Sequence, residues 1–314
     1  MMSNVIDWLL EGDNPSARYL ALTCLQGRPE GDPEVAAARA AIPAQRQARA
    51  ILDAQWPEGY WMHPDVGYSP KYKASVWQVI FLAQMGSPRI PATDRACGYL
   101  LDNARLANGL FTADKTAKGA IPCLSGNLLR AMRQLGCDDP RLDESSEALA
   151  QAVVRDEFRC WCNAKPRAAQ MRGGLPCAWG AVKVLGAFTE VPADRHSAAV
   201  QGAVESGIAL LLGGDLASGG YAAPGGPSPL WLKLGFPLAY AADILEALEV
   251  LLWLGVGRRS GLQAAVDRVV SKRDGAGRWA LECTPHNTWS SFGPLGRPNK
   301  WVTLRALRTL KAWE

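Results

Sequence analysis

Apolar residues recur along most of the chain at intervals of three and four, which is the spacing of one helix face. In the last segment, for example, Trp301, Leu304, Leu307 and Leu310 follow one another three residues apart. Few segments alternate between polar and apolar positions as a half-buried strand does. The long segments are also rich in Ala, Leu, Arg, Gln and Glu. The pattern therefore predicts a chain that is mostly α-helical.

The helical segments repeat along the chain. A proline stands before each of five apolar stretches, and consecutive prolines of this set are 52 to 61 residues apart. Because proline has no N–H to leave unpaired in the first turn of a helix, we expect each of them to open one. The prolines are Pro70, Pro122, Pro176, Pro237 and Pro298, and the apolar stretches are 71–85, 123–135, 177–188, 238–254 and 299–313.

A turn that combines glycine with an aromatic residue follows a more polar helix in each unit. Such turns occur at 55–61, 108–111, 218–221 and 274–279, and the turn at 156–161 keeps the tryptophan without the glycine. A further pair of segments, 16–25 and 33–54, would bring the number of helical hairpins to six.

The second helix of each hairpin is the more apolar one, which suggests a closed double ring with the apolar helices inside. An open solenoid is the alternative. No interdomain linker is visible. We therefore predict an all-α fold, an α/α toroid of about six helical hairpins, in one domain spanning 1–314.

The turns at 55–61 and 272–279 are similar to the repeat motifs of the terpenoid cyclase and protein prenyltransferase superfamily, the prenyltransferase and squalene-oxidase repeats. Members of that superfamily fold as α/α toroids, and the chain resembles single-domain bacterial members of unassigned role. The resemblance implies an apolar, isoprenoid-like substrate in a central cavity. The superfamily's Asp-x-Asp-Asp and Asp-Asp-x-x-Asp motifs are absent, and Cys160-x-Cys162 is only a loose echo of the Asp-x-Cys zinc pair of protein prenyltransferases.

Four cysteines are predicted to meet at one end of the barrel. Cys123 and Cys177 each follow a proline at the start of consecutive inner helices, whose N-termini point the same way in a ring of hairpins. The loop that carries Cys160 and Cys162 belongs to the same end. Four thiolates suit a tetrahedral zinc ion, and they also suit an iron–sulfur cluster. The alternative is that Cys123 and Cys177 are small apolar residues packed at crowded helix starts.

A closed shell of four cysteines would make the zinc structural, whereas an open coordination position would allow catalysis. Cys283 and His286, on the last turn, could supply an extra ligand if their loop folds inward, although a surface loop is the simpler interpretation. The other cysteines lie in or beside apolar stretches and are interpreted as thiols without a function: Cys24, Cys97 and Cys137.

Asp243 is the candidate catalytic acid, because it lies on the most apolar predicted inner helix. A carboxyl group that faces a hydrophobic interior holds its proton more tightly and can act as a general acid. The alternative is an Asp243 paired with Lys, Arg or Tyr of a neighbouring helix. Its basic partners would be Lys71, Lys73 or Lys300, which lie near the starts of inner helices.

Aromatic residues gather near the starts of the predicted inner helices. They could line a cavity for an apolar substrate, or they could pack between helices. The candidates for substrate binding are Tyr72, Trp77, Trp179, Trp231, Phe236 and Tyr240, with Tyr68 and Trp301 nearby. Three tryptophans of the turns are expected to wedge the outer helices against the inner ones: Trp56, Trp61 and Trp279.

Composition excludes several classes of protein. Hydrophobic residues make up 48% of the 314 positions, so the chain can bury a core and is not disordered. The 34 Lys and Arg against 30 Asp and Glu leave a formal net charge of only +4, and no basic run points to nucleic acid. No apolar run reaches the ~20 residues of a membrane span. The first residues lack the basic region of a signal peptide, which favours the cytoplasm and reduced cysteines.

Two hypotheses for the function follow. The first is a zinc-binding enzyme that acts on an apolar, possibly isoprenoid-like small molecule in the barrel, with Asp243 as the acid. The second is a non-catalytic protein that binds a lipid or a peptide and uses a structural zinc to join two hairpins. An iron–sulfur protein is a third hypothesis.

Overall fold

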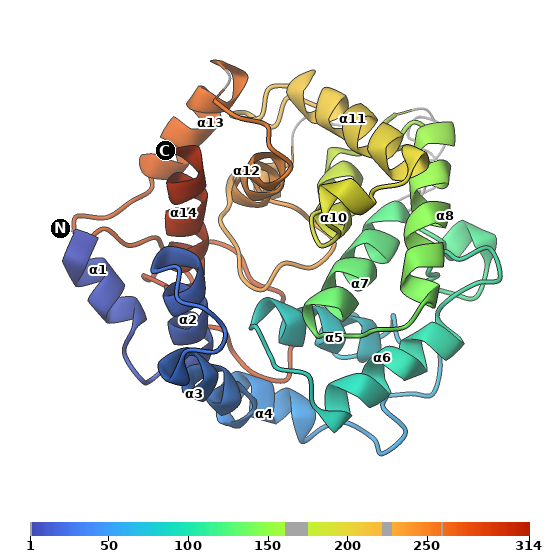
Figure 1. The fold of residues 1–314 in the computed structure, drawn as a ribbon, viewed down its shortest axis with the longest axis horizontal. Coiled ribbons are helices and arrows are strands. Elements are labelled where there is room, and N and C mark those ends of the chain that lie inside the picture. The colour runs from blue at the N-terminus through green and yellow to red at the C-terminus, as the bar shows by residue number, and fades with distance from the viewer. Residues whose placement is uncertain (1, 161–174, 222–227, 259) are drawn as a thin grey trace.

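Six helical hairpins follow one another around a closed ring in the computed structural model, which describes residues 2–160, 175–221, 228–258 and 260–314 (Figure 1). The inner helices are α2 (Pro15–Leu20, continued by a π-helical turn at Ala21–Leu25), α5 (Ser75–Gln84), α7 (Pro122–Gln134), α10 (Ala178–Phe188), α12 (Ile244–Trp253) and α14 (Lys300–Trp313). The outer helices are α1 (Met2–Leu9), α3 (Pro33–Ala41) with α4 (Arg46–Leu52), α6 (Pro91–Asn103), α8 (Arg141–Arg155), α11 (Ala198–Leu212) and α13 (Ser260–Val270).

Short 3₁₀ turns lie in the connections, at Ile42–Ala44, Ala117–Gly119, Ala193–Arg195 and Pro229–Leu232. Over the described ranges the only β-type pairing consists of isolated bridges. The inner helices pack on one another in the order α5, α7, α10, α12, α14 and α2 (Figure 1). The outer helices α3, α6, α8, α11 and α13 each pack on the inner helix that precedes them in the chain. The predicted α/α toroid is therefore confirmed. Within the described part of the chain, no helix combines the length and the apolar character that crossing a bilayer would require.

Ser16, at the start of α2, closes the ring between its last and its first helices. Its hydroxyl donates to the carbonyl of Met85 beyond the end of α5, at 2.6 Å, and accepts from Nε1 of Trp301 in α14, at 2.9 Å. Three inner helices thus meet at one buried hydroxyl. Because the first and last inner helices are joined here, the ring is closed, and the alternative of an open solenoid is wrong.

Aromatic residues of the turns act as wedges, which means that each packs between an outer helix and the inner helix that follows it. Trp61, Phe111 and Trp279 are fully buried, and the backbone N–H of each donates to a hydroxyl in the first turns of the next inner helix. The indole N–H groups of Trp61 and Trp279 also donate to carbonyls of the preceding outer helices, both at 2.7 Å. The predicted packing of Trp61 and Trp279 is confirmed.

Two other tryptophans differ from their predicted positions. Trp231 serves as the wedge of the fifth hairpin, because its indole N–H donates to the carbonyl of Leu216 at 2.8 Å and its ring is 2% exposed. Trp56 is 52% exposed and only stacks on Tyr60, so the prediction that it packs between helices is wrong. The wedge position comes after the glycine, and Trp56 stands before it.

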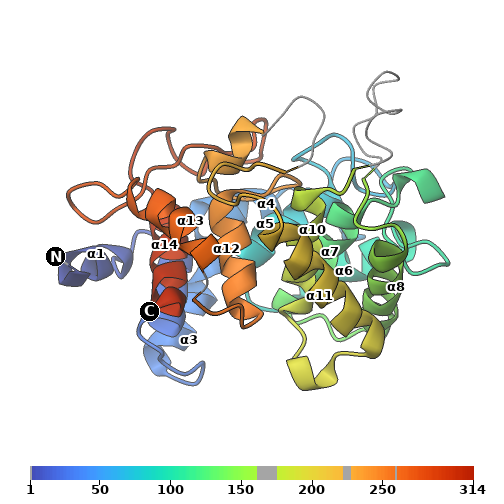
Figure 2. The ribbon, with the colours of Figure 1, turned by 90° about the horizontal axis from the view of Figure 1, so that it is seen from above.

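Of the five prolines that were expected to open a helix, only Pro122 is the first residue of one. The helices α10 and α14 begin two residues after their prolines, with Cys177 and Asn299 as N-caps. Residues 70–74 and 237–243 form turns, so α5 and α12 begin later still. The first segments pair as predicted, because α2 packs against α3, which belongs to the segment 33–54. Figure 2 shows that the long connections into the inner helices gather on one side of the ring.

The segment before α12 runs through the interior of the ring. The backbone of Leu238 exchanges two hydrogen bonds with the amide of Gln84 on α5, at 2.7 and 2.8 Å. The amide of Asn127 on α7 donates to the carbonyl of Ala239 at 2.9 Å. Residues 236–242 therefore fill part of the barrel as an irregular strap, where the sequence predicted a helix.

Candidate functional site

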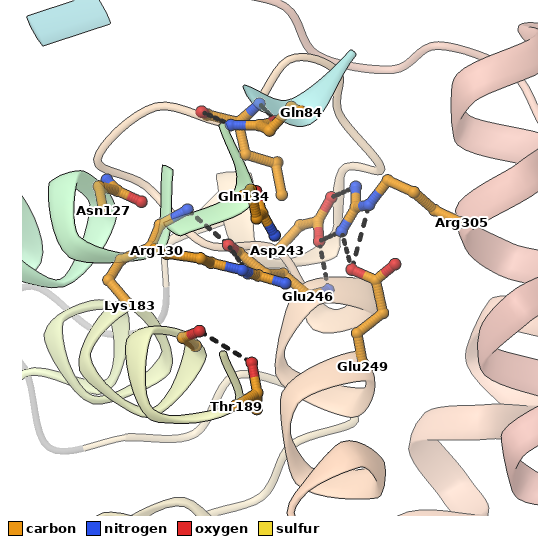
Figure 3. Close-up of polar contacts among 12 residues, drawn as sticks. Gln84, Asn127, Arg130, Gln134, Lys183, Thr189, Asp243, Glu246, Glu249 and Arg305 are labelled. Carbon is orange, nitrogen blue, oxygen red and sulfur yellow. Dashed lines mark hydrogen bonds and ion pairs between the residues drawn. The ribbon is translucent and has the colours of Figure 1, made fainter. Parts of the chain in front are cut away.

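Charged side chains from three inner helices meet inside the ring (Figure 3). Asp243 caps the N-terminus of α12, and Glu246 and Glu249 follow at three-residue spacing, which places them on one side of the helix. Lys183 of α10 and Arg305 of α14 face them. The side chains of all five are between 1% and 8% exposed. Burial of this many charges is costly unless they are paired.

Arg305 holds two of the carboxylates. Its guanidinium donates to both oxygens of Asp243, each at 3.1 Å, and through Nε and Nη2 to Glu249 at 3.2 and 2.9 Å. Burial alone would lower the pKa of Arg305, but the two carboxylates reverse this and raise it. The same attraction, with that of Arg308, lowers the pKa of Glu249 although its burial opposes this. Arg305 and Glu249 are therefore both charged.

Lys183 pairs with the remaining carboxylate. Its ammonium group donates to both oxygens of Glu246, at 2.8 and 2.6 Å. Complete burial lowers the pKa of Lys183, and Glu246 offsets this only in part. Arg130 of α7 approaches Glu246 from the other side, at 3.5 Å.

Asp243 does not face a hydrophobic interior, so that prediction is wrong and its alternative, pairing across helices, is confirmed. Its partner is Arg305 and none of the predicted lysines; Lys300 pairs with Glu11 and Asp13. The backbone N–H groups of Glu246 and Gly235 also donate to its oxygens, at 2.7 and 2.9 Å. A proton on this carboxyl group would have to displace one of these donors. The catalytic role of Asp243 stays a prediction that this geometry does not favour.

A chamber of about 200 Å³ lies beside these pairs. Its walls are formed by the inner helices, by Phe236 and Leu238 of the strap, and by Arg39 of outer helix α3. Pockets for drug-sized ligands usually measure about 300–1,000 Å³, so this one suits a smaller molecule. The charged residues of its lining are Arg39, Arg130, Arg305, Arg308, Glu246 and Glu249, and the amides are Gln84, Asn127 and Gln134.

Most residues of this site were not predicted from the sequence. Arg305 and Arg308 sit three residues apart on an inner helix whose other positions were assigned to the core, and Lys183 and Arg130 sit on two more. The available signal was a charge on a helix predicted to be surrounded by protein. Such a charge needs a partner of opposite sign on a facing helix, and the acidic residues of α12 were already visible.

The six aromatic residues predicted to bind substrate are divided among three places, of which the position of Trp231 in the fifth hairpin is described above. Tyr72, Trp77, Trp179 and Tyr240 form a cluster near the starts of the inner helices, with ring centroids 5.2 to 6.4 Å apart in edge-on contacts. Phe236 stacks on Trp301 at 4.8 Å, and both line the chamber. The structure thus brings one of the six candidates, Phe236, to the chamber.

The cysteines converge less than predicted. The thiols of Cys160 and Cys177 are hydrogen-bonded to each other, and this contact together with burial raises the pKa of Cys177. Cys123 is buried but does not join them, because the described residues contain no group of three potential metal ligands. Cys162 lies outside the described residues. A zinc ion or an iron–sulfur cluster bound by these four cysteines stays a prediction.

The loop of Cys283 and His286 lies at the surface, because Cys283 is half-buried and His286 is exposed. The carbonyl of Cys283 accepts from the N–H of Phe236 at 3.1 Å, and the ring of His286 packs edge-on against Tyr72 at 5.4 Å. This loop therefore covers the aromatic cluster and the start of the strap.

Cys97 and Cys137 form a second pair of thiols, although the sequence suggested no function for either. A hydrogen bond from Cys97 lowers the pKa of Cys137 to about 7. We expect iodoacetamide to modify Cys137 with a rate that rises through pH 7, because the thiolate is the reactive form. In a Cys97→Ala variant the midpoint should move up toward the ordinary value of 9.0. Mass spectrometry of the Cys137 peptide measures both rates, and an unchanged midpoint in the variant would contradict the assignment.

No protein-family profile matches the sequence, and no curated protein matches it either. Among solved structures, the chain is similar to the type II terpene cyclase MstE from Scytonema in complex with its product, merosterolic acid A, at 14% identity and a TM-score of 0.32, over 84% of this chain and 94% of that one. The complex of that cyclase with its substrate, geranylgeranyl dihydroxybenzoate, aligns over the same shares at 15% identity and a TM-score of 0.32. Because both the identity and the TM-score are low, the architecture is argued from the chain's own helices, and the proposed function is argued from the chamber.

Proposed function

We propose that this chain binds a compact, polar small molecule in the chamber at the centre of the ring. The observation that carries the proposal is the set of buried, paired charges that surrounds a space of about 200 Å³. Small-molecule sites commonly combine an enclosed volume with a few convergent polar groups of perturbed pKa.

Stability alone gives no reason for this arrangement. Replacement of a buried ion pair by apolar residues of similar volume is often neutral or stabilising. The inner helices are otherwise apolar and could close such a centre with leucine and valine, as they do elsewhere along their length. Charges kept beside an unfilled space are better explained by a ligand that they recognise.

The chamber supports a polar ligand better than the apolar, isoprenoid-like substrate that the resemblance implied. A long apolar chain needs a wide apolar lumen, and the strap at 236–242 takes up part of the lumen here. Four arginines and two glutamates among the lining residues would also lose hydration against such a substrate without gaining hydrogen bonds. Zinc has no part in this proposal.

Ala131 offers a direct test, because it lies on α7 in the chamber wall and is 2% exposed. A panel of amino acids, sugars, hydroxy acids, dicarboxylates and phosphates is screened by thermal shift, and hits are measured by titration calorimetry. We expect at least one compound to bind, and Ala131→Leu to weaken it at least about tenfold by occupying its space. Ala199→Leu adds the same volume on outer helix α11, away from the chamber, and should leave binding unchanged. Absence of binding across the panel, or equal binding to Ala131→Leu, would contradict the proposal.

A further inference from the structure

The chamber presents more positive than negative charge on its inner surface. Its described lining contains four arginines and two glutamates, a difference of two positive charges. Both glutamates are already paired, Glu246 with Lys183 and Glu249 with Arg305. Further carboxylates hold the arginines from outside the lining: Glu30 pairs with Arg39, Glu190 with Arg130 and Asp243 with Arg305. The acceptors of the site are therefore engaged, whereas some of its donors are not.

Two arginine N–H groups are shielded from solvent and have no acceptor: Nε of Arg308 and Nε of Arg39. Arg308 reaches Glu249 only through Nη2, at 2.9 Å, and its guanidinium lies 4.3 Å from the centre of the Trp253 ring. Arg39 reaches Glu30 through Nη1, at 3.1 Å, and lies over the ring of Tyr19. A buried donor of a charged group without an acceptor is costly. Both side chains line the chamber, from opposite parts of the chain.

Arg130 is a third source of donors in the chamber. Its contacts with Glu190 and Glu246 measure 3.4 and 3.5 Å. Hydrogen bonds between an ionised donor and a carboxylate are usually about 2.7–2.9 Å long. Arg130 thus makes one long hydrogen bond, from Nε to Glu190, and a looser contact with Glu246, so neither carboxylate holds it as tightly as a short charged hydrogen bond would.

We infer that the ligand of the chamber carries an oxyanion group, a carboxylate or a phosphate, which Arg308 and Arg39 bind through their unpaired Nε–H groups, with Arg130 as an additional donor. This inference rests on the proposed function and names the chemical class of its ligand. Arginine suits the task because its planar fork matches the oxygens of carboxylates and phosphates. The pairing of Glu246 and Glu249 with Lys183 and Arg305 keeps the two glutamates from repelling the anion.

The test uses malonate and citrate as carboxylate probes and inorganic phosphate and pyrophosphate as phosphate probes. Each is titrated into the full chain at constant ionic strength, with chloride as the reference anion. We expect saturable binding of at least one probe. Binding of the carboxylate probes or of the phosphate probes then shows which of the two oxyanion groups the ligand carries. Arg308→Lys and Arg39→Lys keep the charge and remove the Nε–H group, so each should weaken binding at least about tenfold.

Arg278→Lys is the matched control. Its Nε is likewise buried without an acceptor, but its guanidinium lies on Trp8, 4.1 Å from the ring centre, and it is absent from the described lining of the chamber. This variant should bind the probes as the unaltered chain does. Circular dichroism and the melting temperature of each variant report whether it is folded.

Three results overturn the inference. The oxyanions bind no better than chloride, all three Arg→Lys variants lose binding equally, or none of the three does. If neutral polar compounds bind and Ala131→Leu blocks them while oxyanions do not bind, the anion class is wrong and the chamber proposal stands. If neither kind of compound binds, both fail.

Discussion

Replacement of Arg305 by leucine is expected to lower the free energy of unfolding by about 3–5 kcal/mol, which is the usual cost of removing one partner from a buried ion pair. The side chain of Arg305 is 8% exposed, and its loss would leave Asp243 and Glu249 buried without their principal cation. Asp243 would keep its two backbone donors and Glu249 would keep Arg308. These remaining contacts place the expected loss inside that range rather than above it.

Urea unfolding followed by circular dichroism measures this loss. Arg49→Leu is the matched control, because Arg49 pairs with Asp53 on an exposed surface, where both side chains are about 70% accessible. Exposed pairs contribute about 0–1 kcal/mol, so this variant should unfold nearly as the original chain does. An Arg305→Leu variant no less stable than Arg49→Leu would show that the central charges are not paired as described. Arg305→Lys keeps the charge with fewer donors and should fall between the two.

Replacement of Trp61 by alanine should cost about 3–5 kcal/mol, in the range found when large aromatic residues are removed from a core. Trp61 is fully buried between α4 and α5, and both its N–H groups are used, by the carbonyl of Ile51 at 2.7 Å and by the hydroxyl of Ser75 at 2.9 Å. The cavity would open where the outer and inner helices of one hairpin meet. Loss of the indole therefore removes both packing and the link between the two helices.

The repeat supplies both a replicate and a control for this experiment. Trp279 occupies the same position between α13 and α14, so Trp279→Ala should lose a similar amount. Trp56, five residues before Trp61, is 52% exposed, and Trp56→Ala should change stability by about 0.5 kcal/mol or less. Equal losses from Trp56→Ala and Trp61→Ala, measured by urea unfolding, would contradict the wedge assignment.

The strap at 236–242 links the ring to the chamber. It is anchored by side-chain amides of α5 and α7, and its residues Phe236 and Leu238 face the chamber. Gly235, where it begins, and Asp243, where it ends, both contact Arg305. The position of the strap and the charge pairs therefore depend on one another, so an alteration of Arg305 is expected to affect the shape of the chamber as well as stability.

The predicted repeat was accurate because each of its signals is local. A helix face recurs every three to four residues, and an aromatic residue next to a glycine turn has few places to pack other than between its own two helices. Trp61, Phe111 and Trp279 confirm this. The exact helix starts were less predictable, because a proline marks the end of one connection without determining how many residues follow before the helix begins, as at Pro237 and Ile244.

The candidate site was predicted less well, because its parts come from distant points of the chain. Asp243 was singled out on its helix, but its partner lies 62 residues away. The strap depends on Gln84, which is 154 residues from Leu238. The thiols of Cys160 and Cys177 do meet, as the ring geometry suggested, while Cys123 on the adjacent helix does not join them. Which residues share an end of a barrel can be inferred from topology, but contact also requires that their side chains point toward each other.

The sequence by itself determined the mostly helical character of the chain, the six hairpins and the division into inner and outer helices, because helix periodicity, turn chemistry and apolar content all act over a few residues. The tertiary structure decided which charges pair, where the strap runs and what lines the chamber. Those outcomes depend on the rotation of each inner helix about its own axis, and the close packing of its neighbours sets that rotation. A turn of one helix by a single residue, about 100°, would carry Arg305 out of reach of Asp243.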